Sequence, residues 1–317
     1  KKKIQSRSLL GWQIPILTDR NHSKARIVKI NSKVLRGFLK HYRVLVIAGF
    51  QGISEENRIT TLGRGGSDTT AVAISCALGL KTCEIYTDVD GIFTSDPKIV
   101  KDATKIDYIT YEEILELASV GSKVLHPRSV ELAMKYGIRV HVRSSFDKKL
   151  GTMVIKEENK IEKEVATGIT SSENEAKITL KGIPDKPGIA AKIFSTLASN
   201  NINVDMIVQN ITDDGKFASL TFTVPVEDER KSLKKLRSSN IKFKMIDSNS
   251  SICKISIVGV GMKSNVGVAQ KMFETLAKKN INIQVISTSE IKISVLIDLP
   301  KKKIALNALH AAYGLGK

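Results

Sequence analysis

An internal repeat in the second half of the chain limits most strongly the folds that this sequence can adopt. Residues 188–207 (GIAAKIFSTLASNNINVDMI) align without gaps with residues 267–286 (GVAQKMFETLAKKNINIQVI), and 11 of the 20 positions are identical. Such self-similarity indicates one supersecondary unit used twice. Because each unit is small for an isolated core, we expect the two copies to pack together through sheets or helices.

The apolar pattern around each copy predicts the same order of elements. AKITLKGI and CKISIVGV precede the two copies, and FASLTFTVP and IKISVLIDLP follow them. Within the first copy, Ile189, Ile193 and Leu197 recur at four-residue spacing, which predicts one buried helix face. Each copy is therefore predicted to form a strand, a loop, a helix and two further strands.

The first half of the chain alternates strand-like and helix-like segments. Buried strands are predicted at 43–50, 82–91 and 138–145, and the segments between them have helical patterns. Thr110 and Glu113 have the spacing of a capping box, and Pro127 suits the first position of a helix. Strands that alternate with helices of this length predict a mainly parallel α/β sheet.

Composition and charge exclude several classes of protein. The net charge is +18, but the lysines are spread along the chain and aromatic residues make up only 5%. We therefore expect a solvated basic surface and no nucleic-acid binding. No apolar run approaches the roughly 20 residues that span a bilayer, so no membrane association is expected. The three distant cysteines indicate neither a disulfide framework nor a zinc site, which favours a reducing cytoplasmic location.

A glycine-rich loop, TTLGRGGSDTT at residues 60–70, is the first candidate for a functional site. Gly65, Gly66 and Ser67 allow backbone N–H groups to approach an anion at a helix N-terminus. Arg64 adds a guanidinium suited to a carboxylate or phosphate, and Asp68 is predicted to be the N-cap. The alternative is a plain tight turn before a capped helix. The loop lacks the lysine of a P-loop and does not match G-x-G-x-x-G.

A second polar loop follows the strand predicted at 82–91. The strand ends in Thr87 and Asp88, and the sequence continues through Asp90-Gly91 to Asp96-Pro97. Ligands of open α/β sheets bind beyond the carboxyl ends of the strands, so this loop and the glycine-rich loop are expected at one sheet edge. Alternatively, the Asp-Gly and Asp-Pro pairs are turn residues, which is the reading that we prefer for Pro97.

Four segments, taken in order, resemble the aspartate kinase family: TTLGRGGSDTTAVAISCALGL, CEIYTDVDGIFTSDPKIV, YEEILELASVGSKVLHPRSVELA and VRSSFDKKLGTMV. The tandem repeat resembles the paired ACT domains of that family. Residues 156–166 (KEENKIEKEVA) are charged and lack a clear apolar period, which indicates a linker. The resemblance implies an amino-acid-kinase domain at 1–155 and ferredoxin-like βαββαβ ACT domains at 167–247 and 248–317, with approximate boundaries that allow interleaving. The implied reaction transfers the ATP γ-phosphoryl group to the β-carboxylate of L-aspartate, the first step towards lysine, threonine and methionine.

The resemblance also implies roles for single residues. Arg64 binds a carboxylate of aspartate beside Gly65, Gly66 and Ser67, and Asp68 orders the donors around the transferred phosphoryl group. The implied ATP contacts are Ser67, Thr87, Asp88, Phe93, Lys98 and Lys123. Mg²⁺ enters with ATP, and no metal site made by the protein alone is expected. Without the resemblance, Lys123 is better interpreted as an exposed helix lysine.

The repeat is implied to bind an end-product amino acid, lysine or threonine or both. The implied effector contacts are Asp185, Lys186, Pro187, Gly188, Ile189, Ala190, Gln209 and Asn210. Asp185 suits the ammonium group of the effector, although turn formation explains it equally well. Val266 stands where the first copy has Pro187, so we expect the second copy to bind differently. ACT domains of this family imply a homodimer or a higher homo-oligomer.

One segment typical of the family is missing from the sequence. The family begins with a strand that carries a KFGG-type segment, followed by a threonine and a glutamate that contact aspartate, and none of these is found. We therefore expect a kinase domain incomplete at its N-terminus. The alternative function is a catalytically weak or inactive chain that acts as an ACT-type regulatory subunit. A kinase with another acceptor is less consistent with RGGSDTT beside an ACT pair.

Overall fold

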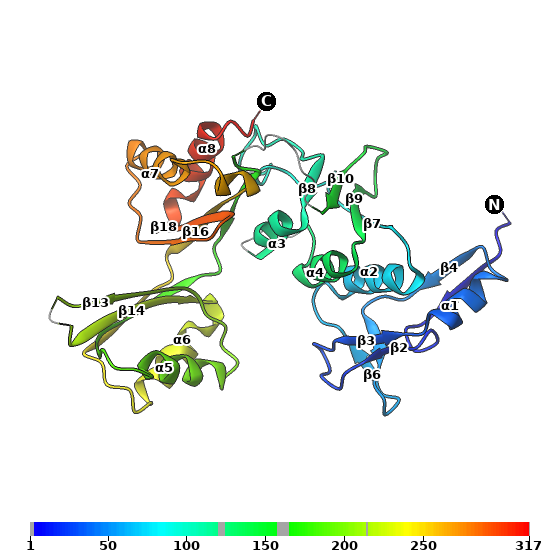
Figure 1. Cartoon of the computed structure of the whole chain (residues 1–317), viewed down its shortest axis with the longest axis horizontal. Helices are drawn as coiled ribbons and strands as arrows, with labels where there is room; N and C mark the ends of the chain where they lie inside the picture. The colour runs from blue at the N-terminus through cyan, green and yellow to red at the C-terminus, as the bar shows by residue number, and fades with distance from the viewer. Residues whose placement is uncertain (1–2, 120–123, 157–164, 214, 317) are drawn as a thin grey trace. The chain divides into compact units, whose positions relative to one another are not determined.

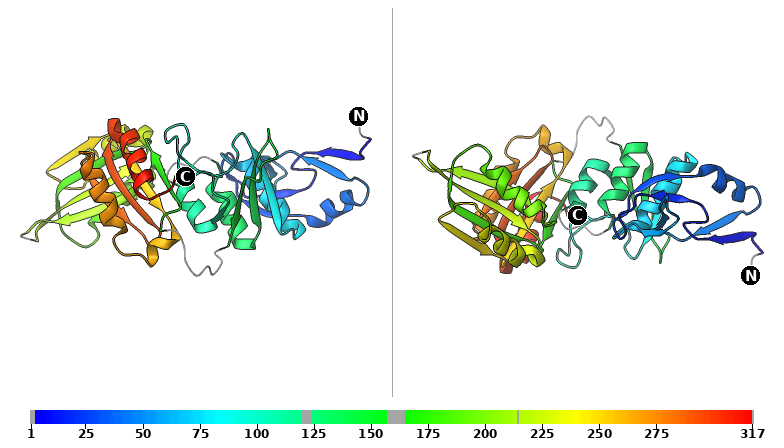
Figure 2. Two further views of the ribbon diagram at one scale, coloured as in Figure 1. Left: turned by 90° about the horizontal axis from the view of Figure 1, so that it is seen from above. Right: turned by 90° about the horizontal axis from the view of Figure 1, so that it is seen from below.

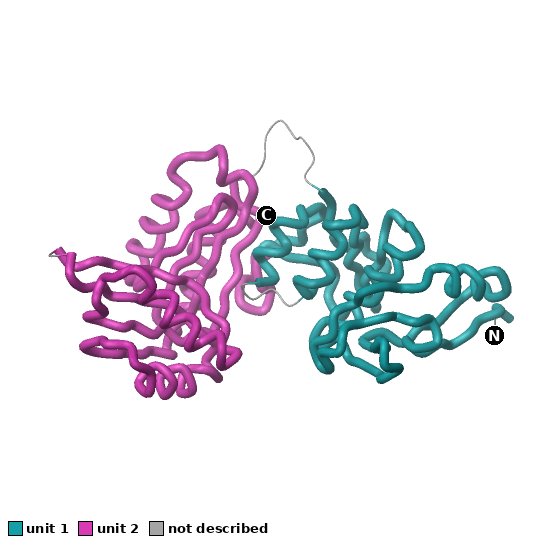
Figure 3. Tube along the Cα trace, turned by 60° about the horizontal axis from the view of Figure 1, so that its bottom comes forward, with its two compact units in different colours: residues 1–94, 104–163 teal, residues 95–103, 164–317 magenta. Residues whose placement is uncertain are grey.

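The chain divides into two compact units. The structure is a computed structural model that describes residues 3–119, 124–156, 165–213 and 215–316. One unit comprises residues 1–94 and 104–163, and the other comprises residues 95–103 and 164–317 (Figure 3). Among the described helices, none has the length and apolar character needed to cross a membrane.

One four-stranded sheet of the first unit has the strand order β7-β9-β10-β8 (Figure 1). Its strands are β7 (Thr82–Thr87), β8 (Tyr108–Thr110), β9 (Arg139–Ser144) and β10 (Thr152–Ile155). The β7/β9 and β8/β10 pairs are parallel, and the β9/β10 pair is antiparallel. The α/β class is therefore confirmed, with a sheet that mixes both kinds of pair.

Two further sheets are described in this unit, one with two strands and one with four. β1 (Ser6–Leu9) pairs in parallel with β4 (Val44–Ile47). A second sheet has the order β3-β2-β5-β6, with β2 (Ile16–Thr18), β3 (Ile27–Ile30), β5 (Gln51–Ile53) and β6 (Ile59–Thr61). The prediction of a buried strand at 43–50 is wrong for β4, because Val44 is 42% exposed and Val46 is 58% exposed.

Four helices pack on these sheets, and α4 contacts both α2 and α3 (Figure 1). They are α1 (Ser32–Leu39), α2 (Gly66–Leu78), α3 (Tyr111–Ser119) and α4 (Pro127–Tyr136). The capping box is confirmed, because the Thr110 N–H donates to Glu113 Oε2 (3.1 Å) and the Glu113 N–H donates to Thr110 Oγ1 (3.2 Å). Pro127 is the first residue of α4, as predicted.

The first copy of the repeat forms a domain that we call the first repeat domain. It contains β12 (Ala176–Pro184), α5 (Ile189–Ala198), β13 (Asp205–Ile211), β14 (Phe217–Val224), the 3-10 turn η1 (Val226–Asp228), α6 (Glu229–Arg237) and β15 (Met245–Asn249). Its antiparallel sheet has the order β13-β14-β12-β15. Phe222, Ile193 and Leu236 lie in the core between sheet and helices, so the predicted order of elements is confirmed.

The second copy forms the second repeat domain, in which α7 and α8 lie together against the sheet (Figure 2). It contains β16 (Ile252–Val258), η2 (Val260–Lys263), α7 (Val268–Lys278), β17 (Val285–Thr288), β18 (Lys292–Asp298), η3 (Leu299–Lys301) and α8 (Lys302–Ala312). Its sheet has the order β11-β16-β18-β17, which adds β11 (Gly168–Ser172) to the strands of the second copy.

β11 joins the sheet of the second domain although it precedes the first domain in the sequence. It pairs antiparallel with β16 and takes the place that β15 has in the first repeat domain. The first repeat domain is thus inserted between β11 and β16. The sequence range that we predicted for the first ACT domain begins at 167 and includes β11. The limits of the linker stay a prediction, since residues 157–164 lie outside the described ranges.

Candidate functional site

The glycine-rich loop connects β6 to α2, and α2 begins at Gly66. Gly65 is the N-cap residue, with φ 69° in the left-handed region, and it supplies no side chain to cap the helix. Our prediction of Asp68 as the N-cap is wrong, because Asp68 lies in the first turn of α2. The turn needs a left-handed residue before the helix, which glycine adopts more readily than aspartate. The first turn therefore offers backbone donors to a ligand.

The backbone of Gly65 lies directly against the side chain of His126, which precedes α4. A Cβ atom placed on Gly65 would be 2.2 Å from His126 Cβ and 2.3 Å from its Cγ. No larger residue fits at this position without movement of the loop or of the imidazole. The close approach therefore sets the position of the loop relative to the start of α4.

Arg128 also ties the glycine-rich loop to α4. Its Nη1 donates to the carbonyl oxygen of Leu62 (2.6 Å), and its Nη2 donates to that of Ala25 (2.9 Å). The Arg128 backbone N–H donates to Nδ1 of His126 (3.3 Å), so this ring nitrogen is an acceptor. His126 and Arg128 thus hold the loop in one conformation, and neither was among the residues that we predicted.

Burial changes the ionisation of two groups beside this loop. Burial raises the pKa of Asp68 above its ordinary value, although the backbone amide and ring of His126 oppose the shift. Burial, together with the nearby Arg128, lowers the pKa of His126. The Asp68 carboxyl group is thus half-buried and lies beside fixed donors, which is typical of functional sites.

A second loop that we did not predict lies against α2. Phe50 has φ 69°, and its backbone N–H donates to Thr70 Oγ1 (3.1 Å). A Cβ atom on Gly49 would be 3.2 Å from Ser67 Cα, so Gly49 allows the close approach of the loop to Ser67. A left-handed phenylalanine is unusual and concentrates at sites where the surroundings impose it. The glycines on both sides of Phe50, in AGFQG after a strand, were the signal available in the sequence.

Thr87 and Asp88 lie together at the carboxyl end of β7. Thr87 Oγ1 donates to Asp88 Oδ1 (3.1 Å), and the Thr87 carbonyl oxygen accepts from the Ser145 N–H (2.8 Å). The short connection 79–81 joins the end of α2 to the start of β7, and the two elements are in contact. α2 therefore runs back along β7, which places the glycine-rich loop towards the edge of the sheet where β7 ends.

The structure says less about the other predicted nucleotide contacts, which are Phe93, Lys98 and Lys123. Phe93 is half-buried after β7 and forms an isolated bridge with Lys105. Lys98 is exposed and belongs to the second unit. Lys123 lies outside the described residues. All three roles stay predictions.

The predicted effector contacts lie in the first repeat domain, and two of them, Asp185 and Gln209, are in contact. Residues 185–188 form the loop from β12 to α5, and Gly188 is the N-cap of α5 with φ 88°. Gln209 and Asn210 are exposed on β13, and Gln209 Nε2 donates to Asp185 Oδ1 (3.4 Å). The loop and β13 thus bring the Asp185 carboxylate, the Gln209 amide group and the start of α5 close together, whereas the Asn210 side chain follows on the alternate face of the strand.

The equivalent loop of the second repeat domain differs, and it borders a cavity of about 400 Å³. Val266 is fully exposed in this loop, and the Tyr313 hydroxyl donates to the Val268 carbonyl oxygen (2.6 Å) at the start of α7. Lys271 and Tyr313 line the cavity beside the loop. The two loops therefore have different surroundings, and different ligand binding by the second copy stays a prediction.

In the described ranges, the side chains of the protein alone form no visible metal site. No group of three or more His, Cys, Asp or Glu side chains that could hold a metal ion gathers there. The residues at the glycine-rich loop are instead donors, namely Arg64 and the backbone amides of the first turn of α2, and donors suit phosphate oxygens.

Three family models match the chain. Residues 1–144 match the amino acid kinase family, and residues 178–238 and 255–313 each match an ACT domain. The aspartate kinase of Pseudomonas putida is 48% identical over 318 residues, which cover 99% of this chain and 77% of that protein. The aspartokinase of Mycolicibacterium smegmatis is 45% identical, with 98% of this chain and 76% of that protein covered.

Solved structures of an aspartokinase are also similar to this chain. The structure of E. coli aspartokinase III in complex with aspartate and ADP has a TM-score of 0.79 and 27% identity, and the match covers 98% of this chain and 70% of that chain. The same enzyme in complex with lysine and aspartate has a TM-score of 0.74 and 26% identity, covering 97% and 69% of the two chains.

Proposed function

Since the chain belongs to the aspartate kinase family, we propose that its first unit transfers the γ-phosphoryl group of ATP to the β-carboxylate of L-aspartate. In this reaction a carboxylate oxygen forms the new P–O bond, the bond to the bridging oxygen breaks, and ADP leaves. The observation that carries the proposal is the glycine-rich loop, which His126 and Arg128 hold in a left-handed turn at the start of α2.

The proposed mechanism depends on positioning and on positive charge rather than on a covalent nucleophile. The Arg64 guanidinium binds a carboxylate of aspartate, and Gly65, Gly66 and Ser67 bring backbone donors close to the reacting groups. Asp68 acts as a positioning residue that orders these donors. Its partial removal from water makes the local electrostatic interactions stronger than they would be in solution.

We assign the nucleotide to the edge of the sheet at the end of β7. Thr87 and Asp88 contact the adenosine part of ATP, and Phe93, Lys98 and Lys123 complete the nucleotide site, with Ser67 next to the phosphates. The E. coli relative was solved with ADP, which supports nucleotide binding here. Mg²⁺ bound with ATP would neutralise charge on its phosphate oxygens. We place the reaction in the cytoplasm.

The second unit is proposed to regulate the kinase by binding lysine or threonine. Asp185 pairs with the effector ammonium, Lys186 to Ala190 surround its carboxylate at the start of α5, and Gln209 and Asn210 add hydrogen bonds. The E. coli relative was solved with lysine, which supports an amino-acid effector. Two copies of the chain are proposed to associate through their ACT domains.

Substitutions in the glycine-rich loop test the kinase function. Arg64→Lys is expected to raise the KM for aspartate about 10–100-fold, because a lysine cannot make the two parallel hydrogen bonds of a guanidinium. Asp68→Asn is expected to lower kcat about 10²–10³-fold, with a KM for aspartate close to that of the unsubstituted chain. The measurement is formation of aspartyl phosphate from ATP and Mg²⁺, trapped with hydroxylamine.

Gly37→Ala is the control for these variants, since a Cβ atom at Gly37 in α1 meets no other atom within 4 Å. We expect its kinetics to match those of the unsubstituted chain. The absence of any aspartyl phosphate from the unsubstituted chain would contradict the proposed reaction. If Arg64→Lys lowered kcat by as large a factor as it raised the KM for aspartate, the role of Arg64 in binding aspartate would be contradicted.

Asp185→Asn tests the effector site. Losing the charged partner of the effector ammonium is expected to raise the lysine or threonine concentration for half-maximal binding about 10–100-fold. Isothermal titration calorimetry with each amino acid measures this change. Asp247→Asn, an exposed aspartate of β15, is the matched control and should bind as the unsubstituted chain does. Equal affinities of both variants would remove Asp185 from the site.

A further inference from the structure

Two lysines at equivalent positions of the repeat extend from their own domain into the other one. Lys177 in β12 aligns with Lys254 in β16, because AKITLKGI aligns with CKISIVGV. In each strand the residues on either side of the lysine belong to the core beneath the helices of that domain. Since side chains alternate along a strand, both lysines lie on the opposite face of their sheet.

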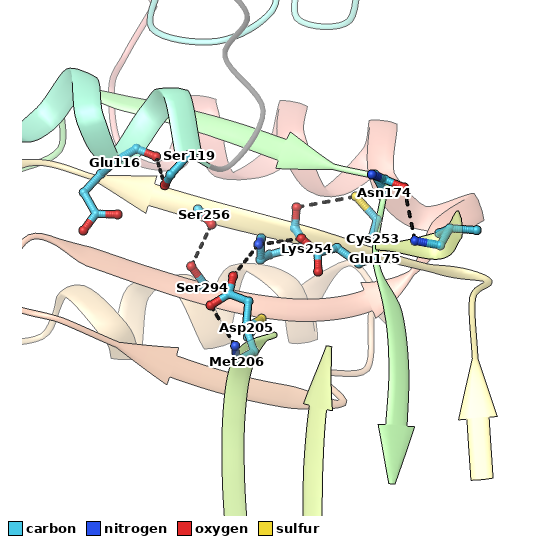
Figure 4. Close-up of polar contacts among 11 residues, drawn as sticks. Glu116, Ser119, Asn174, Glu175, Asp205, Met206, Cys253, Lys254, Ser256 and Ser294 are labelled. Carbon is cyan, nitrogen blue, oxygen red and sulfur yellow. Dashed lines mark hydrogen bonds and ion pairs between the residues drawn. The ribbon is translucent and has the colours of Figure 1, made fainter. Parts of the chain in front are cut away.

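Lys254 is almost completely buried, with only 4% of its side chain exposed. Its Nζ lies 2.8 Å from Asp205 Oδ2 and 2.5 Å from Glu175 Oε1 (Figure 4). Glu175, in the connection from β11 to β12, is also buried, whereas the side chain of Asp205 is 60% exposed. A buried ammonium group needs such partners. Lys254 thus joins β16 of the second repeat domain to β13 of the first.

Lys177 makes the reciprocal contact. Its Nζ donates to Gln284 Oε1 (2.6 Å), and Gln284 Nε2 donates to Asp298 Oδ1 (2.6 Å). Gln284 directly precedes β17 and aligns with Asp205 in the repeat. Each domain therefore binds, through the lysine of its first strand, the residue at the start of the second strand of the other domain. One of the two contacts is an ion pair, and the other joins an ammonium group to an uncharged amide.

The backbone beside the ionic contact has an unusual conformation. Met206 has φ 46° and is buried against Ile252 and Leu296 of the second repeat domain. The register of β13 with β14 shifts between Asp205 and Val208. Asp205 Oδ1 accepts the Met206 N–H (2.8 Å), and Lys254 keeps the pKa of Asp205 below its ordinary value although burial opposes this. A left-handed non-glycine residue persists only where its surroundings impose it.

The other end of β13 carries the predicted effector contacts. Gln209 lies four residues after Asp205 on this strand and donates to Asp185 of the effector loop. A single strand thus connects the effector loop, through Asp205, to the buried pair of Lys254 and Glu175. A shift of β13 at one end would change the distance from Asp205 to Lys254 at the other.

We propose that the reciprocal contacts Lys254–Asp205 and Lys177–Gln284 couple the two repeat domains, so that an amino acid bound beside β13 changes the packing of β16. The ionic contact dominates, because displacing Asp205 leaves a buried ammonium group with one partner instead of two. This coupling rests on the proposed regulatory function for its biological role. The mechanical link between β13 and β16 is independent of that function.

Hydrogen exchange of the full chain, followed by mass spectrometry, tests the link without any ligand. Asp205→Asn keeps an acceptor for the Met206 N–H and removes only the charge. We expect it to speed amide exchange about tenfold both in β16 and in 208–211 of β13. Asp213→Asn, an exposed aspartate after β13, is the matched control and should change neither segment. Faster exchange confined to 205–206 would overturn the proposal.

The same experiment with saturating lysine or threonine tests the regulatory role. In the unsubstituted chain, the effector should slow exchange in 185–190 and also in β16. In Asp205→Asn, the protection of 185–190 should remain and that of β16 should be lost. Equal protection of β16 in both chains would overturn the coupling. If neither amino acid protects 185–190, the proposed effector function is wrong, while the ligand-free comparison still decides whether β13 and β16 are linked.

Discussion

Lys254→Met is expected to lower the free energy of unfolding by about 3–5 kcal/mol. The substitution keeps most of the apolar stem but removes the ammonium group, so Glu175 becomes a buried carboxylate without its cation. Breaking a buried ion pair by removing one partner is costly because the remaining charge has no solvent to stabilise it. Urea denaturation followed by circular dichroism measures the change. The slope of the free energy of unfolding against urea concentration should be the same for the variant and the unsubstituted chain.

Lys263→Met provides the matched control for this prediction. Lys263 is in the same domain, and its Nζ lies 3.0 Å from Glu290 Oε2. Half of the Lys263 side chain and most of the Glu290 side chain are exposed. Exposed pairs of this kind contribute about 0–1 kcal/mol. The double variant Lys254→Met/Glu175→Gln should regain part of the loss, because the buried carboxylate is then neutral. Equal stability of Lys254→Met and Lys263→Met would show that the buried pair does not stabilise the domain.

Gly65→Ala is expected to abolish most kinase activity and to lower stability by about 2–4 kcal/mol. Alanine at φ 69° is strained, and its Cβ atom would overlap the side chain of His126. The loop or the imidazole must then move, and a displacement of about 1 Å at a reacting group can cost about 10²-fold in rate. Urea denaturation and the hydroxylamine assay measure the two effects.

Gly79→Ala separates the effect of the contact from that of the backbone conformation. Gly79 ends α2 with φ 70°, but a Cβ atom there meets no other atom within 4 Å. We expect Gly79→Ala to cost about 1 kcal/mol through the backbone alone and to keep the kinetic constants. If the two alanine variants lose the same stability and activity, the contact between Gly65 and His126 is not what fixes the loop.

The order of elements was largely predictable because it depends on local patterns. The repeat predicted a strand, a helix and two further strands in each repeat domain, but not α6, β15 or α8, and the capping box and Pro127 predicted two helix starts. The placement of β11 was not predictable in the same way. Its residues, GITSS, have little apolar alternation, and its partner β16 lies about 80 residues away, so the pairing is decided by tertiary packing.

The residues of the candidate sites were also predictable only where local sequence patterns mark them, and not where tertiary packing decides their role. The glycine-rich loop could be found because its residue types act within a few positions of one another. The role of His126 could not, because it depends on a contact with Gly65 that no spacing in the sequence indicates. Lys254 looks like an ordinary solvent-facing lysine of an alternating strand. Its burial follows from Glu175 and Asp205, which come from two other segments of the chain.

The insertion of the first repeat domain between β11 and β16 has a consequence for the order of folding during synthesis. β12 and β15, which begin and end the inserted domain, are neighbours in one sheet, so this domain can fold as soon as residue 249 has left the ribosome. The second repeat domain must wait for α8, while β11 remains without the strand that it pairs with. The nascent chain therefore carries an unpaired strand through the synthesis of a complete domain, and this interval is where we expect aggregation or chaperone binding to act.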